Sequence, residues 1–273
     1  MEMEIRRAAA AIESAKAILV GAGAGMGVDS GLPDFRGSEG FWRAYPAFKH
    51  LGLSFSQLAN PMWFKEDPRL AWGFYGHRMH LYRDTTPHEG FAALLRLAAG
   101  RPTFAFTSNV DGQFERAGWD AGQVYEVHGS IHWLQCTAPC SDAVWSADGV
   151  DVEVDERDFR AVGPLPECPR CGCVARPNIL MFGDYGFLES RSWQQSRVYD
   201  DWRRTHGGPG LVVIEIGAGS AVPTVRVESE SHLRLGADAL VRINPREAEG
   251  PSGTVPIPEG AARALTMIEE EIA

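Results

Sequence analysis

The chain has 273 residues, of which 44% are hydrophobic, so it is long enough for one large α/β domain or a main domain with a small insert. A formal charge of −10 and an isoelectric point near 5.3 argue against a nucleic-acid partner, because nucleic-acid binders normally present a basic face. No apolar stretch approaches the roughly 20 residues that span a bilayer, and we therefore expect a cytoplasmic protein with no membrane partner.

The first predicted strand leads into a glycine-rich turn. Residues 4–16 alternate charges with Ala and Ile as a helix does, and the apolar run over residues 17–22 predicts a buried strand. The turn that follows opens with Gly-Ala-Gly at residues 23–25. Glycines let a backbone approach a pyrophosphate closely, and a helix that starts after the turn points N–H groups at the phosphate, which predicts a nucleotide site. The common G-x-G-x-x-G fingerprint lacks its third glycine here, and a glycine-rich surface turn is the alternative.

An aromatic-rich segment over residues 37–90 follows the turn. Its Trp, Phe and Tyr residues are spaced among polar residues and prolines, which predicts a helical insert with its own apolar face. At such spacings aromatic side chains more often pack in a core than line a cleft.

Four later runs predict strands that end in polar or glycine-rich residues. Residues 102–107 lead to Ser108-Asn109-Val110-Asp111, 123–127 to His128, 211–216 to Gly217-Ala218-Gly219-Ser220, and 239–243 to Asn244. Near-continuous apolar strands with helices between them imply a Rossmann-like α/β fold, a parallel sheet with helices on both faces. Open α/β sheets bind ligands beyond the carboxyl ends of their strands, so these residues are candidates for a site. Residues 259–272 predict a closing helix.

All five cysteines lie between residues 136 and 173. Cys136 and Cys140 form one close pair, Cys168 and Cys171 form another, and Cys173 competes with Cys171 as a fourth ligand. Two such pairs are typical of tetrahedral zinc held by four thiolates, and free buried thiols or a redox pair are the alternative. Four thiolates leave no open coordination position, so we expect a structural zinc that holds a small ribbon together.

Several segments together resemble the sirtuins, the NAD-dependent protein deacylases, of the bacterial type. Residues 23–37, GAGMGVDSGLPDFRG, closely resemble the family's NAD-binding signature, and TSNVD at 107–111 resembles its Thr-Gln-Asn-Ile-Asp. YEVHGS at 125–130 is similar to the segment that supplies the general base, and PNILMFGD at 177–184 to the segment that pairs with an acyl-lysine peptide. The family also carries a structural zinc ribbon after its catalytic histidine.

The matches run in the family's order from about residue 17 to residue 247, and they include three departures. Gly27 stands where the family has Ser, and Ser108 where it has Gln. The family's Gly-Thr-Ser is replaced by Gly217-Ala218-Gly219, which removes a hydroxyl that usually contacts the cofactor.

The resemblance implies a role for each matching residue. His128 is the implied catalytic base, which takes a proton from a ribose hydroxyl of the co-substrate NAD. The implied cofactor-binding residues are Gly23, Ala24, Gly25, Asp34, Phe35, Arg36, Ser108, Asn109, Asp111, Gly217, Ser220 and Asn244; an arginine at position 36 is equally consistent with a loop-anchoring salt bridge. Residues implied to bind the acylated protein or peptide substrate are Tyr75, Arg78, Ile179, Leu180, Phe182 and Gly183, and those implied to bind zinc are Cys136, Cys140, Cys168 and Cys171.

The acyl group to be removed depends on the segment around Tyr75 and Arg78. Their Tyr-x-x-Arg spacing resembles that of sirtuins that prefer succinyl or malonyl lysine, because a phenol and a guanidinium together bind a distal carboxylate. In the alternative interpretation Arg78 is a helix-surface charge and Tyr75 packs inward. Removal of acetyl groups is the broader prediction.

These assignments predict two modules. Residues 1–36, 91–130 and 177–273 form an NAD-binding Rossmann-like domain, and the helical insert 37–90 with the zinc ribbon 131–176 forms a small domain. Two other functions remain open: an NAD glycohydrolase or ADP-ribosyltransferase on the same fold, and an NAD-sensing interaction module.

Overall fold

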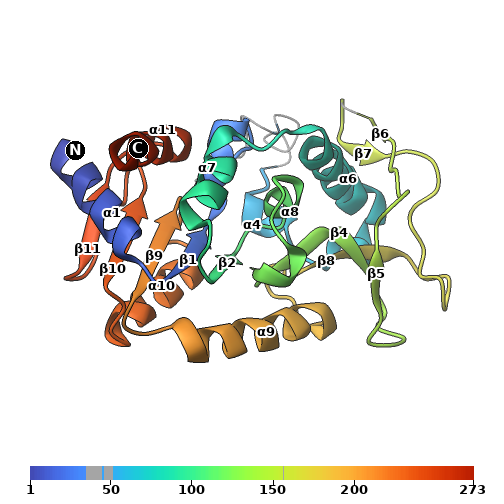
Figure 1. Cartoon of the computed structure of the whole chain (residues 1–273). Helices are drawn as coiled ribbons and strands as arrows, with labels where there is room; N and C mark the ends of the chain where they lie inside the picture. The colour runs from blue at the N-terminus through green and yellow to red at the C-terminus, as the bar shows by residue number, and fades with distance from the viewer. Residues whose placement is uncertain (35–44, 46–51, 156) are drawn as a thin grey trace.

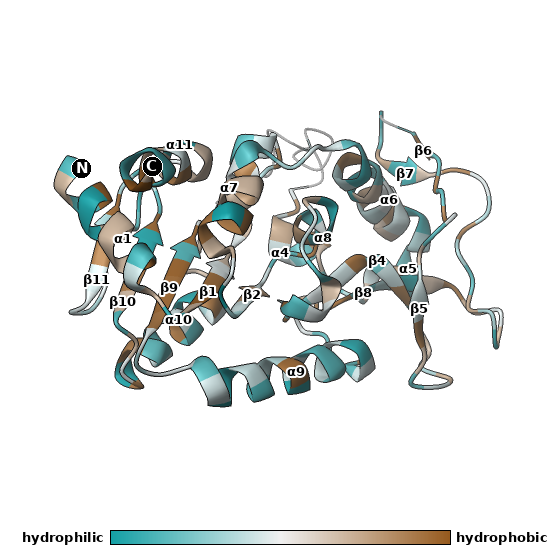
Figure 2. Ribbon diagram, viewed as in Figure 1, coloured by the Kyte–Doolittle hydropathy of each residue, from teal (hydrophilic) through white to brown (hydrophobic). Residues whose placement is uncertain are grey.

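The structure, a computed structural model, describes residues 1–34, 45, 52–155 and 157–273. Its largest part is a six-stranded sheet in the order β11-β10-β9-β1-β2-β3, in which every neighbouring pair is parallel. The central strands are almost wholly apolar, as expected for a sheet covered on both faces (Figure 2). The strands are β1 (Ala17–Ala22), β2 (Thr103–Thr107), β3 (Val124–Glu126), β9 (Leu211–Ile216), β10 (Ala239–Ile243) and β11 (Thr254–Ile257).

Helices cover both faces of this sheet (Figure 1). The helices α1 (Glu2–Ser14), α7 (Glu89–Ala98) and α11 (Ala261–Ile272) pack on one face, and α9 (Ser190–His206) and α10 (Thr224–Arg234) on the other. In α11 the buried residues Ala261, Ala264, Leu265 and Ile268 follow the spacing of one helix face. The prediction of a parallel α/β sheet with helices on both faces is confirmed.

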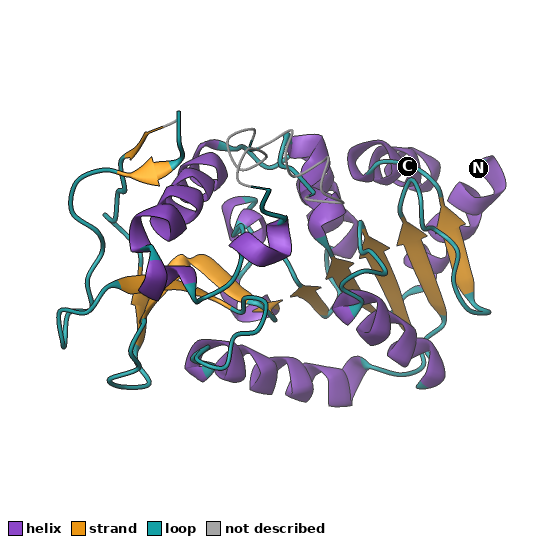
Figure 3. Cartoon of the chain, turned by 180° about the vertical axis from the view of Figure 1, so that it is seen from behind, coloured by secondary structure: helices purple, strands orange, loops and turns teal. Residues whose placement is uncertain are grey.

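A smaller module lies beyond β3, at the end of the sheet opposite β11 (Figure 3). Its antiparallel sheet has the order β5-β4-β8 and packs with α6 around a second apolar cluster, separate from those of the main sheet. Pro68 begins α6, and the Asp67 side chain caps it by accepting a hydrogen bond from Leu70 N. The elements are α4 (Phe55–Leu58), α5 (Trp63–Glu66), α6 (Pro68–Asp84), β4 (Gly129–Cys136), β5 (Val144–Ser146), β6 (Val154–Asp155), β7 (Arg160–Ala161) and β8 (Ala175–Ile179).

Three short helices follow strands of the main sheet, η1 after β1 and the other two between β2 and β3. They are the 3-10 helices η1 (Ala24–Ser30) and η2 (Ala121–Gln123) and the helix α8 (Gln113–Arg116). Within the described ranges, none of the helices has both the length and the apolar content needed to cross a lipid bilayer.

Candidate active site

A cavity of about 950 Å³ opens between the main sheet and the small module. From the main sheet it is lined by residues that follow the carboxyl ends of five strands: Ala24 after β1, Ser108, Asn109 and Asp111 after β2, His128 after β3, Gly219 and Ala221 after β9, and Arg246 and Glu247 after β10. The carboxyl edge of an open parallel sheet is where α/β proteins bind ligands, so the cavity is the candidate active site.

Most of the residues implied by the sequence to contact cofactor or substrate line this cavity: Ala24, Asp34, Tyr75, Arg78, Ser108, Asn109, Asp111, His128, Ile179, Leu180 and Phe182. Another six belong to neighbouring segments but are absent from the lining: Gly23, Gly25, Gly183, Gly217, Ser220 and Asn244. Phe35 and Arg36 lie outside the described residues.

The glycines of the first turn are required by contacts within the protein. A Cβ atom on Gly23 would lie 2.7 Å from the Cα of Ala218, and one on Gly25 would lie 2.6 Å from the Cα of Gly217. Gly217 itself has φ of 63°, which favours glycine. The turn is followed by the 3-10 helix η1 rather than by the α-helix that a phosphate-binding fingerprint leads into. These glycines therefore bring the loops after β1 and β9 into backbone contact beside the cavity.

Asn109 and Asp111 are held in place by backbone groups. Asn109 Nδ2 donates to the carbonyl oxygen of Gly23 at 3.0 Å, and Asp111 Oδ1 accepts from Gln113 N at 3.0 Å. Both side chains are buried and line the cavity. Burial raises the pKa of Asp111 to about 6, although the hydrogen bond from Gln113 and the charge of Arg78 oppose that shift. An amide and a carboxyl group in this arrangement are suited to bind a carboxamide.

His128 lies two residues after the end of β3 and is half-buried at the cavity. Burial lowers its pKa below the ordinary range, and a hydrogen bond with the Ser108 backbone opposes this effect. Its Nε2 lies 3.4 Å from the hydroxyl of Thr224, and its carbonyl oxygen accepts from Leu180 N at 2.9 Å. A histidine held neutral at physiological pH has the protonation state that a general base requires.

Gly129 explains why the chain turns so sharply after this histidine. It has φ of 77°, and a Cβ atom there would lie 2.0 Å from the carbonyl oxygen of Asn178. Only glycine permits β4 to start against β8 at this point, where Gly129 pairs with Ile179. The pairing brings the end of β8 beside His128.

Arg78 lies inside the protein, with 5% of the residue exposed, so the interpretation of a helix-surface charge is wrong. Its guanidinium lies 5.2 Å from the ring centroids of Phe74 and Tyr82, and Nε and Nη2 both donate to the Tyr82 hydroxyl. The Tyr75 side chain is buried against it, and the Tyr75 hydroxyl has no hydrogen-bond partner within the described part of the chain. A buried cation and an unpartnered hydroxyl at the cavity wall are suited to a polar or anionic ligand group.

The segment after β8 is exposed at the cavity and rests on a buried ion pair that sequence reasoning missed. Leu180 and Phe182 are exposed, while Arg176 and Asp184 are buried and pair through two contacts of 2.7 and 3.0 Å. Asp184 also accepts hydrogen bonds from Met181 N and Gly186 N. The Asp184 carboxylate therefore shapes the turn at the end of the segment. In the sequence, the only signal for this ion pair was the acidic residue at the end of PNILMFGD.

Arg246 and Glu247 are two further cavity residues that sequence reasoning missed. They follow Asn244, whose buried side chain accepts hydrogen bonds from Arg246 N and Glu247 N and donates to the Ala218 carbonyl oxygen. Asn244 thus positions the turn that carries them instead of lining the cavity itself. The sequence signal that could have identified Arg246 and Glu247 as cavity residues was their position shortly after a predicted strand.

Four cysteines of the small module lie close enough together to hold a metal ion. The sulfur atoms of Cys136, Cys140, Cys168 and Cys171 all lie within 4.8 Å of one another, and two of the distances are 3.6 and 3.7 Å. Tetrahedral zinc with Zn–S bonds of about 2.3 Å places sulfur atoms about 3.8 Å apart, so the four thiols fit this metal. Cys173 is not part of the group, and its carbonyl oxygen accepts from Cys168 N. The geometry therefore favours Cys171 over Cys173 as a fourth ligand, and the group is suited to structural zinc.

Comparisons with known proteins agree with this arrangement. A protein 36% identical over 163 residues is the NAD-dependent protein deacylase of Pyrococcus furiosus; the match covers 59% of this chain and 59% of that relative. The solved ADP-ribose complex of a Sir2 homologue has a TM-score of 0.75 and 25% identity, and covers 97% of this chain and 95% of its own. Sir2 bound to an acetylated peptide shares the fold, with a TM-score of 0.71, 19% identity, and coverage of 98% of this chain and 99% of its own.

The model of the Sir2 family matches residues 23–204, which include the glycine-rich turn, His128 and the four-cysteine site. Because this match covers more than half of the chain and agrees with the fold and the cavity, the chain belongs to the Sir2 family.

Proposed function

We propose that this protein is an NAD-dependent protein deacylase, which removes acyl groups from lysine and yields nicotinamide and O-acyl-ADP-ribose. The observation that carries the proposal is that one cavity joins a neutral histidine, a buried amide with a buried carboxyl group, and an exposed extended segment. The relative with ADP-ribose and the one with an acetylated peptide support a dinucleotide and a peptide as the two ligands.

In this proposal NAD contributes the ribose carbon from which nicotinamide leaves and to which the acyl carbonyl oxygen bonds. Asn109 and Asp111 bind the carboxamide of nicotinamide through their amide and carboxyl groups, beside Asp34. His128 then accepts a proton from a ribose hydroxyl, which turns that hydroxyl into the nucleophile for acyl transfer. Phe35 and Arg36 keep their implied roles at nicotinamide and at the phosphates as predictions.

The peptide is proposed to lie along residues 179–183. Strand addition to an exposed segment gives affinity through main-chain hydrogen bonds and tolerates many sequences. Leu180 and Phe182 already use their N–H groups within the protein, on His128 and Ala59. The peptide would therefore pair along the opposite edge of the segment, where it would have to replace the 3.4 Å hydrogen bond from Met181 N to Asp184. We also place the protein in the cytoplasm, because a thiolate zinc site needs reduced cysteines.

For the acyl group, we propose that Tyr75 and Arg78 extend the range from acetyl to the acidic succinyl and malonyl groups. The buried guanidinium lies where a distal carboxylate could form a charge-assisted hydrogen bond without competing water.

The test is nicotinamide release from NAD with unmodified, acetylated and succinylated forms of one peptide. We expect release to depend on an acyl group, and Arg78→Met to lower kcat/KM for the succinylated peptide by about 10- to 100-fold, the size of a lost charge-assisted contact. The acetylated peptide should lose less, and Arg83→Met, on the same helix but bonded to the Ala147 and Val150 carbonyls, is the control. Equal losses for both acyl groups would reject the carboxylate role, and release without any acyl group would favour the glycohydrolase or transferase.

A further inference from the structure

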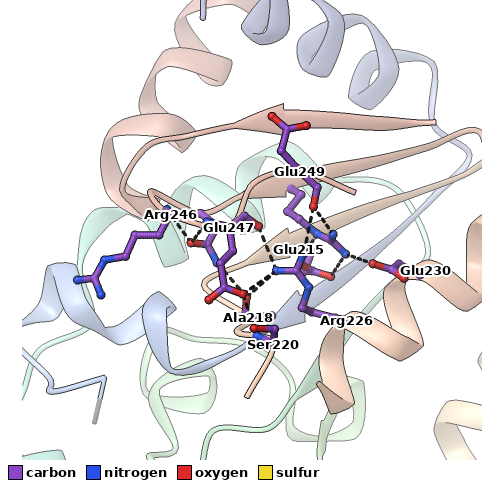
Figure 4. A network of polar contacts seen from close by, with 10 residues as sticks. Glu215, Ala218, Ser220, Arg226, Glu230, Arg246, Glu247 and Glu249 are labelled. Atoms are coloured by element: carbon purple, nitrogen blue, oxygen red, sulfur yellow. Dashed lines mark hydrogen bonds and ion pairs between the residues drawn. The ribbon is translucent and has the colours of Figure 1, made fainter. Parts of the chain in front are cut away.

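One arginine of α10 ties together the loops that follow β9 and β10 (Figure 4). Arg226 Nη1 donates to the carbonyl oxygens of Ala218 at 3.4 Å and Glu247 at 3.0 Å, and Nη2 donates to that of Glu249 at 3.0 Å. Nη1 also lies 3.4 Å from the Glu247 carboxylate. A single planar guanidinium, with only 15% of its side chain exposed, thus contacts both loops.

A second set of contacts joins the same two loops. The Glu247 carboxylate accepts a hydrogen bond from Ser220 N at 2.9 Å, and Asn244 Nδ2 donates to the Ala218 carbonyl oxygen at 2.9 Å. Glu247 is therefore fixed from two sides, by Arg226 and by the Ser220 backbone. These contacts leave the backbone after β9 anchored to the backbone after β10 at three points.

The strands below the loops are joined by a buried ion pair. Arg242 of β10 and Glu215 of β9 are register partners with a contact of 2.6 Å, and both are almost fully buried. Arg242 also pairs with Glu230 of α10 at 2.8 Å and donates to the Glu249 carbonyl oxygen. Arg242 thus joins the ends of the two strands without Arg226. The two arginines share one partner in the loop after β10, the Glu249 carbonyl oxygen, and only Arg226 also reaches the loop after β9.

The loops that Arg226 joins form one wall of the cavity. Gly219, Ala221, Arg246 and Glu247 line it, and the Arg246 side chain points away from the Arg226 network (Figure 4). This wall stands on the other side of β1 from β2 and β3, whose ends carry Asn109, Asp111 and His128. In the proposed function, a dinucleotide with nicotinamide at Asn109 would extend along the carboxyl edge of the sheet toward this wall.

We propose that Arg226 is a positioning residue that holds this wall in the arrangement that receives the adenosine half of NAD. The inference rests on the proposed function. Ala218 carries no side-chain hydroxyl, and its carbonyl oxygen is bound by Arg226 and Asn244, so the wall is shaped from behind by the arginine. Without that contact the loops sample other arrangements, and the apparent Kd rises by the inverse of the competent fraction.

The experiment compares the native protein with Arg226→Met and Arg226→Lys in steady-state kinetics and in calorimetric titration with ADP-ribose. We expect Arg226→Met to raise KM for NAD and Kd for ADP-ribose about tenfold, with kcat and KM for the acylated peptide changed less than about twofold. Lysine keeps the charge but not the planar set of donors, so its effect should be intermediate.

The matched control is Arg203→Met. Arg203 contacts Glu228 and Ser231 of the same helix from α9, outside the cavity lining, so its loss should lower thermal stability without raising KM for NAD. A purely structural role of Arg226 predicts the same pattern as Arg203, a lower melting temperature with unchanged KM and Kd, and that result would overturn the inference. If the native protein itself binds no ADP-ribose, the proposed function fails instead.

Discussion

At the scale of single residues, Asp111 combines burial with a carboxyl group that is costly to ionise. Its pKa is raised to about 6 in the fold, so between about pH 4 and 6 the folded state binds a proton that the unfolded chain releases. The stability that this group contributes is therefore present at low pH and lost as the pH rises through about 6. A binding site that keeps such a group trades stability for function.

Asp111→Asn should consequently stabilise the protein while impairing it. Asparagine keeps an oxygen for Gln113 N and removes the buried charge. We expect the free energy of unfolding to rise by about 1–3 kcal/mol at pH 8, and the gain to vanish near pH 4. Nicotinamide release should fall at the same time.

Urea unfolding at the two pH values measures this gain, with the exposed Asp148→Asn as a control expected to change stability by less than about 0.5 kcal/mol. An Asp111→Asn protein that is less stable than the native one at pH 8 would show that the carboxylate is favourably bound in the fold.

Residues of the site differed in how far the sequence could predict them. His128, Asn109 and Asp111 come shortly after apolar runs, so the sequence predicted their position at the carboxyl edge of the sheet. Arg226 and Arg176 were not, because each acts through loops whose approach depends on tertiary packing. The glycines of the first turn are still predicted to contact phosphate, and the sequence did not indicate their additional contact with the loop at 217–218.

At the scale of elements, the four-cysteine site links β4, which ends at Cys136, to the segment before β8. The pattern of two cysteine pairs predicted this site, but only the geometry separates Cys171 from Cys173. Thiolate-bound zinc contributes directly to the folding of small modules, so its loss should affect the second apolar cluster most.

Cys171→Ser should therefore reduce bound zinc well below one ion per chain, and Cys173→Ser should leave one. Metal analysis of the purified proteins gives the zinc content, and chelator-induced unfolding gives the consequence for stability. We expect Cys171→Ser to lower the melting temperature by at least several degrees, as the loss of a metal site does. Equal zinc contents in the two variants would contradict the assignment of Cys171.

At the scale of the whole molecule, long apolar runs predicted the six-stranded sheet well. The short strands β5, β6 and β7 have two or three residues each and carry no periodic signal, so only packing in the small module reveals them. The exact division into two domains, with boundaries at residues 36, 90, 130 and 176, stays a prediction. The apolar clusters, one on the sheet under α1, α7 and α11 and one around α6, follow only the coarse separation into a main sheet and a small module, because the second cluster also contains Leu32, Val110, Ile179 and Met181.

The proposed reaction has two substrates, and the cavity between these parts offers a place for each of them. The dinucleotide would lie along the carboxyl edge of the sheet, and the peptide along the segment that follows β8. The acyl carbonyl oxygen would meet the ribose carbon between them, near His128.

The most direct test of this account is mass spectrometry of the products from NAD and a peptide whose acyl carbonyl oxygen is labelled with ¹⁸O. The account predicts one labelled O-acyl-ADP-ribose for each nicotinamide released. It also predicts a loss of about 10²- to 10⁴-fold in acyl transfer for His128→Ala but not for His80→Ala, which changes a half-buried histidine that pairs with Asp151. Unlabelled ADP-ribose, formed at the same rate without acyl-lysine, would contradict deacylation and identify water as the nucleophile.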